Sequence, residues 1–215
     1  MPASKHREIF IGRARGADIG RAIDEGRQAP RARLTLPPAP AGQSVVGIDP
    51  GKRGGLVYLA PGGAVDGARV MPLRLDGTPD TETIEAWLRW RAPSRIYLEL
   101  VHAHPNDGKG RLWTFAAHMG ALKDAIARTK IPLVEVDPQR WQNAMLIGLP
   151  RGSKTKESAR TRCAELWPGE SFKAARGRVP HDGLCDAALI AAWGLYYSHG
   201  VRLRSELPRG AGDLL

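Results

Sequence analysis

The stretch VVGIDPGKRGGLVYLAPGG, residues 45–63, constrains the fold of this chain more than any other. A short run of β-branched residues leads to Asp49 and a Pro-Gly turn, and a second apolar run follows a pair of glycines. The pattern predicts two strands joined by a tight turn, with Asp49 at the carboxyl end of the first strand. Sheet proteins commonly bind metals and ligands at that end. An aspartate before Pro-Gly is also ordinary turn chemistry, so this stretch alone leaves both interpretations open.

The rest of the chain predicts an α/β protein with five strands. Glycine-rich connections favour an antiparallel meander for the first three strands, and helices separate the later ones. We expect the second to fifth strands at 56–60, 68–73, 95–103 and 131–138. Helical spacing of apolar residues predicts helices at 81–91, 112–130, 139–146, 155–169 and from 182 onward.

Further acidic residues occur in the expected core elements. Alternation along the fourth strand places Glu99 on the same face as Tyr97 and Val101, where an unpaired charge is costly. That position favours a metal, a salt bridge from elsewhere, or a strand end. Asp182 and Asp186 are four residues apart on one helix face, with Cβ atoms about 6 Å apart. A divalent ion would relieve their repulsion; alternatively, Asp182 caps the helix and Asp186 lies on the surface.

The charge of the chain favours a polyanionic partner. Thirty-two Lys and Arg residues against 22 Asp and Glu residues give a formal net charge of +10. Two distant cysteines without a CxxC pair argue against a structural zinc site or a disulfide scaffold. No apolar run approaches the roughly 20 residues that a membrane span needs. The helix at 155–169 carries Arg160 and Arg162, and the candidate phosphate-binding cations are Lys109, Arg111, Lys154, Lys156, Arg176 and Arg178.

The order of elements and acidic residues resembles the RNase H-like fold, and in particular RuvC-type Holliday junction resolvases of the phage or organellar kind. The resemblance covers about residues 45–197. The resemblance rests on the motifs GIDPG, YLELVHA, VDPQRW, KTKESARTRCAELWP and HDGLCDAALIA. The resemblance implies an RNase H-like α/β fold with a mixed five-stranded sheet, three antiparallel strands followed by two parallel ones, flanked by helices.

The resemblance also implies a Mg²⁺-dependent endodeoxyribonuclease that nicks four-way junctions or other branched DNA. Mn²⁺ is a possible substitute, and two ions would act on the phosphodiester. Family members often carry Asp or His three residues before the last aspartate, where this chain has Gly183. We therefore assign the fourth acidic position to Asp182, with His181 as an alternative ligand or a general base. The implied catalytic and metal-binding residues are Asp49, Glu99, Asp182 and Asp186.

We expect three parts in the chain: a basic, flexible Pro/Arg-rich extension at 1–44, the nuclease domain at 45–200, and a tail at 201–215. A four-way junction is nearly two-fold symmetric, which favours a homodimer. The helix at 112–128 is the candidate interface, with ordinary core packing as the alternative. The expected compartment is the cytoplasm of a bacterium or phage-infected cell, or an organelle if the extension is a targeting segment.

Other functions are compatible with parts of the pattern. The GIDPGKRGG motif also resembles the phosphate-binding hairpin of actin-like ATPases, but those proteins need two such domains. An RNase H, a flap or fork endonuclease, and a non-catalytic nucleic-acid-binding protein of the same fold remain alternatives.

Overall fold

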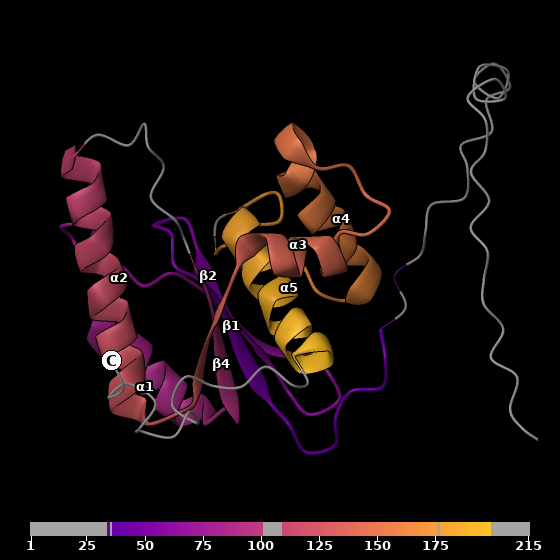
Figure 1. Cartoon of the computed structure of the whole chain (residues 1–215), viewed down its shortest axis with the longest axis horizontal. Coiled ribbons are helices and arrows are strands. Elements are labelled where there is room, and N and C mark those ends of the chain that lie inside the picture. Colours follow the sequence, from indigo (N-terminus) through magenta and orange to yellow (C-terminus); the bar gives the residue numbers. More distant parts are fainter. Residues whose placement is uncertain (1–33, 35, 101–108, 176, 199–215) are drawn as a thin grey trace, which may run out of the picture. The chain divides into compact units, whose positions relative to one another are not determined.

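The structure is a computed structural model that describes residues 34, 36–100, 109–175 and 177–198. This part of the chain contains five strands and five α-helices in the order β1-β2-β3-α1-β4-α2-β5-α3-α4-α5, with a short 3₁₀ turn at Gly152–Lys154 before α4 (Figure 1). The strands are β1 Val45–Asp49, β2 Gly55–Leu59, β3 Val65–Val70, β4 Arg95–Glu99 and β5 Leu133–Val136. The helices are α1 Thr81–Arg91, α2 Lys109–Thr129, α3 Pro138–Met145, α4 Thr155–Leu166 and α5 Asp182–Tyr197.

The strands form one mixed sheet in the order β3-β2-β1-β4-β5. β1 pairs antiparallel with β2, and β2 pairs antiparallel with β3, whereas β4 runs parallel to both β1 and β5. The predicted fold class and the division into three antiparallel and two parallel strands are therefore confirmed. Because β1, β4 and β5 are parallel, their carboxyl ends meet at one edge of the sheet, and Asp49 and Glu99 are the last residues of β1 and β4.

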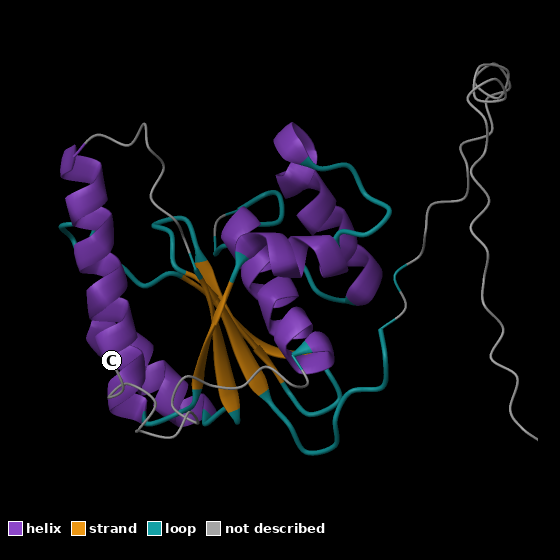
Figure 2. Cartoon of the chain, viewed as in Figure 1, coloured by secondary structure: helices purple, strands orange, loops and turns teal. Residues whose placement is uncertain are grey.

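Helices cover both faces of the sheet, α1 and α2 on one side and α3, α4 and α5 on the other (Figure 2). Alternation along β4 divides its side chains as predicted. Ile96 and Leu98 belong to the apolar cluster beneath α1 and α2, whereas Tyr97 packs edge-on against Trp193 of α5. Val101 of the same predicted strand lies outside the described residues.

α5 lies directly against the sheet because β1 carries a glycine at its centre. A Cβ atom added at Gly47 would overlap the carbonyl oxygen of Ala187 and lie 2.5 Å from the backbone nitrogen of Ala191. The helix is buried on nearly all sides, which explains its run of alanines. This close approach positions Asp186 of α5 above the carboxyl end of β1.

One predicted strand was misplaced. β3 begins at Val65 and ends at Val70, three residues earlier than the predicted 68–73. The reason is a tight turn at Gly62 and Gly63, both with positive φ, in which the Gly63 amide donates to the Ala60 carbonyl. The chain therefore re-enters the sheet at once instead of forming a longer loop.

The parts flanking the domain are only partly described. Leu34, Leu36 and Ala39, which belong to the predicted extension, pack against the apolar cluster on the α5 side of the sheet. Residues 1–33 and 199–215 lie outside the described residues, so the predicted division at 44, 200 and 201 stays a prediction. Within the part of the chain that the structure describes, no helix is long and apolar enough to cross a membrane.

Candidate active site

Three of the predicted carboxylates meet at the carboxyl edge of the sheet. Asp49 ends β1, Glu99 ends the neighbouring strand β4, and Asp186 lies in the N-terminal part of α5, which packs on β1. The backbone amide of Gly51 donates to Asp49 Oδ1 over 3.1 Å, and Trp141 Nε1 donates to Glu99 Oε1 over 2.8 Å. Each strand carboxylate is thus oriented by a donor of its own.

Burial changes the acidity of the two strand carboxylates. Loss of solvent raises the pKa of Asp49, while the hydrogen bond from the Gly51 amide and the electrostatic influence of His181 and Lys156 act to lower it. The pKa of Glu99 rises to about 7, chiefly by burial, with the Trp141 hydrogen bond opposing and the charge of Asp49 adding to the shift. Glu99 therefore changes protonation near neutral pH.

Asp186 is the most strongly affected of the three. Its pKa rises to about 8, first because of burial and then because of the negative charges of Asp49, Glu99 and Asp182, while Lys156 opposes the shift. In the absence of a cation, this carboxyl holds a proton at neutral pH. Strongly shifted carboxyls that repel one another at one edge of a sheet are typical of a functional site.

Asp182 and His181 lie beside this cluster. Asp182 is not the N-cap of α5, the alternative role that the sequence left open for it. His181 is the residue that precedes α5, and Asp182 is the first residue of the helix. The Asp182 carboxylate is ion-paired with two residues of α4, Arg160 at 2.6 Å and Lys156 at 3.7 Å. His181 Nδ1 is buried and has no hydrogen-bond partner among the described residues.

The glycine at position 183 has a steric reason. A Cβ atom there would overlap the carbonyl oxygen of Arg53 and lie 2.5 Å from the Cα atom of Gly54. The turn between β1 and β2 therefore lies directly on the first turn of α5. An Asp or His side chain at this position, as in many RuvC-type proteins, does not fit without a shift of that turn.

The donor set matches a divalent cation in its chemistry. Carboxylate oxygens are the ligands that Mg²⁺ and Mn²⁺ prefer, and a cation would relieve the repulsion that raises the pKa of Asp186. As the side chains stand, no three His, Cys, Asp or Glu residues of the described ranges are grouped closely enough to hold an ion. Binding therefore requires the carboxylates to move toward a shared ion.

The predicted phosphate-binding cations fall into two groups. Lys154, Lys156 and Arg178 are exposed side chains, and Lys156 reaches the acidic cluster. The side chains of Lys109 and Arg111, and the whole of Arg176, lie outside the described residues.

The sequence did not show three roles that the structure reveals. Arg162 is not part of a basic surface, because it is buried and binds Glu165 and the carbonyl of Ile147. The Trp141 contact with Glu99 joins residues 42 positions apart and leaves no local signal. Arg160, four residues after Lys156, shares its helix face, and this spacing could have indicated their common partner.

Comparisons with known proteins bear on the fold. Neither the protein-family models nor the curated proteins gave a match to this chain. Among solved structures, Thermus thermophilus RuvC in complex with a Holliday junction substrate is similar over 73% of this chain and 94% of that chain, with 20% identity and a TM-score of 0.56. This chain has a RuvC-type RNase H-like fold.

Two further solved structures are similar. A second structure of Thermus thermophilus RuvC covers 73% of this chain and 96% of its own, with 19% identity and a TM-score of 0.50. The yeast mitochondrial Holliday junction resolvase Ydc2 covers 72% of this chain and 78% of its own, with 17% identity and a TM-score of 0.42. The two RuvC structures confirm, at the level of the fold, the resemblance that the sequence indicated.

Proposed function

We propose that this protein is a divalent-metal-dependent endonuclease that nicks branched DNA, with four-way junctions as its substrate. The observation that carries the proposal is the convergence of Asp49, Glu99 and Asp186 in a RuvC-type fold. Three partly buried carboxyls whose charges oppose one another destabilise the folded protein, so a structural role alone does not account for them. A cation bound between the three carboxylates would account for them.

The three carboxylates would hold the metal, with Asp182 or His181 as further ligands. A divalent cation bound there activates water and stabilises the leaving oxygen of a phosphodiester. The chain itself supplies orientation. Trp141 holds one oxygen of Glu99, and the Gly51 amide holds one oxygen of Asp49, so each strand carboxylate would keep one anchored oxygen while it moves toward an ion.

The surrounding cations would bind the DNA backbone. Lys52 and Arg53 are exposed in the turn beside Asp49, and Lys154, Lys156 and Arg178 are exposed near the start of α4 and before α5. Lys109, Arg111 and Arg176 belong to the same proposal. Contacts of this kind bind phosphates without reading bases, so affinity is expected to fall steeply with salt concentration.

A homodimer would suit the two-fold symmetry of a four-way junction. The described part of α2 supports this arrangement, because Ala116, Ala117, Gly120 and Ala121 form an exposed face of small side chains. A hollow of about 390 Å³ lies between this helix and the turn that follows Asp49, lined by Lys52, Phe115, His118 and Met119 among others. A second subunit on α2 would therefore lie near the active site.

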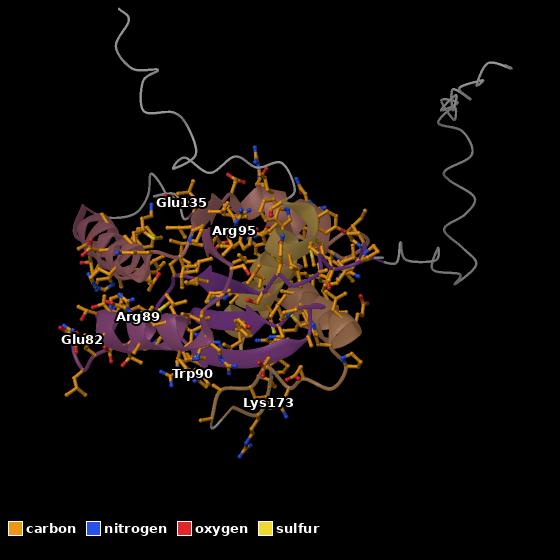
Figure 3. All side chains as sticks on the ribbon, turned by 90° about the horizontal axis from the view of Figure 1, so that it is seen from below. Glu82, Arg89, Trp90, Arg95, Glu135 and Lys173 are labelled. Atoms are coloured by element: carbon orange, nitrogen blue, oxygen red, sulfur yellow. The ribbon has the colours of Figure 1, made fainter. Side chains whose placement is uncertain are left out.

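The test of the active site is the substitution Asp49→Asn. We expect nicking of a synthetic four-way junction in the presence of Mg²⁺ to fall by about 10³-fold or more, because a ligand of the cation loses its charge. The matched control is Glu82→Gln, which neutralises an exposed carboxylate on α1 (Figure 3). Gel analysis of a labelled junction measures both. Nicking by Asp49→Asn at the wild-type rate would contradict the proposed site.

A further inference from the structure

Asp182 has two positively charged partners that are more exposed to solvent than it is. Its side chain is 15% exposed, whereas Arg160 is 38% exposed and Lys156 is 72% exposed. Lys156 also lowers the pKa of Asp49 and Asp186, so it faces the acidic cluster as well as Asp182. A DNA strand at the acidic cluster can therefore contact these two cations.

The pairing of Arg160 with Asp182 is incomplete. The two charged groups are 2.6 Å apart, but their geometry is not that of a hydrogen bond, and the buried Asp182 oxygen has no hydrogen-bond donor among the described residues. Arg160 Nε is also buried without a hydrogen-bond partner there. A guanidinium with an unused donor can bind a phosphate oxygen, for which its planar fork is well suited.

In an exchange of partners both cations stay paired, and only Asp182 loses its counterions. Arg160 and Lys156 are partly exposed, so a DNA phosphate can reach both cations and compete with Asp182 for them. Asp182 would then be a poorly solvated carboxylate without a counterion, beside three other carboxylates. A divalent cation would supply the opposite charge that such a group lacks.

We propose that Arg160 and Lys156 are positioning residues that exchange Asp182 for a DNA phosphate, and that Asp182 becomes a metal ligand only in the DNA complex. This inference rests on the proposed function and adds substrate control to it. By linkage, DNA tightens metal binding and the metal tightens DNA binding by the same factor. The free protein then holds an incomplete metal site, which DNA binding completes.

A double-mutant cycle with metal alone tests the first half of the exchange. Mn²⁺ binding to the full-length protein is measured by calorimetry or electron paramagnetic resonance, without DNA. We expect Arg160→Gln to bind Mn²⁺ about five- to tenfold more tightly than wild type, because Asp182 is released. In the Asp182→Asn background, Arg160→Gln should change the affinity little.

The control for a general effect of charge is Lys173→Gln, in the exposed loop before α5 (Figure 3). It should leave Mn²⁺ affinity nearly unchanged in both backgrounds. An equal effect of Arg160→Gln with and without Asp182 would overturn the proposal, as would no effect in either background. Thermal melts of each variant establish that the protein is folded.

Junction binding in EDTA tests the second half, without any metal. We expect Asp182→Asn to bind a four-way junction several-fold more tightly than wild type, because Arg160 and Lys156 are free for phosphate. The gain should vanish in the double variant with Arg160→Gln; a gain that persists there would overturn the exchange. Failure of the proposed function is seen separately, as wild-type protein that does not nick the junction with Mg²⁺.

Discussion

Replacement of Asp186 by asparagine is expected to stop nicking and, at the same time, to stabilise the metal-free protein at alkaline pH. The first effect follows from loss of a proposed metal ligand. The second follows from the pKa of Asp186, which burial and neighbouring carboxylates raise from 3.8 to about 8. Ionising this group in the folded protein costs free energy, and asparagine keeps the shape of the side chain without the charge.

The direction of the pH effect follows from proton binding. Between the unfolded and folded pKa values of Asp186 the folded state binds more protons at this group, so its ionisation progressively lowers the stability of the wild type as pH rises from about 4 through 8. The gain from Asp186→Asn should therefore be larger at pH 8.5 than at pH 5.5, on the order of a few kcal/mol. Thermal melts in EDTA at both pH values measure it, with Glu82→Gln as the control. Lower stability of Asp186→Asn at pH 8.5 would contradict the assigned pKa.

The substitution Gly47→Ala is expected to destabilise the protein by several kcal/mol. The new methyl group would overlap the Ala187 carbonyl and lie 2.9 Å from the Cβ atom of Ala191. Both residues belong to the part of α5 whose backbone packs against β1. β1 and α5 would have to separate, and Asp49 and Asp186 would separate with them. Loss of nicking is therefore expected to accompany the loss of stability.

Gly169→Ala is the matched control for this change. It adds the same methyl group to a glycine with nothing within 4 Å, in the exposed turn after α4. There the substitution should be neutral or stabilising by up to about 1 kcal/mol, because alanine meets no neighbouring atom and reduces the freedom of the unfolded chain. Urea unfolding measures both variants. Equal stability of the two would show that α5 does not rest on β1 as described.

The sequence predicted those parts of the fold that local chemistry determines. The bounds of α1 agree with the prediction, because Asp80 caps the helix by accepting from the Thr83 amide, and Pro93 follows its end. The sequence also predicted that Asp49, Glu99 and Asp186 lie close together, because they fall on core elements whose order resembles that of the RNase H-like fold. β3 was misplaced because the conformation of the Gly62-Gly63 turn cannot be read from composition.

Contacts between distant segments could not be predicted in the same way. Nothing near Trp141 in the sequence indicates that it binds Glu99, and nothing near Asp182 indicates that α4 supplies its counterions. Arg162 carried the same signal as Arg160, yet one is buried and the other lies beside the acidic cluster. These differences depend on the way α3 and α4 pack against α5.

The most direct test of the central claim is cleavage by the wild-type protein, with Mg²⁺, of a four-way junction, a linear duplex of the same sequence, and an RNA–DNA hybrid. We predict nicks in the junction, paired across its two-fold axis, at a protein concentration that leaves the duplex and the hybrid intact. Equal cleavage of all three, or preference for the hybrid, would contradict the assignment of a junction-selective endonuclease. Binding of the junction without cleavage under any divalent cation would identify a non-catalytic protein with this fold.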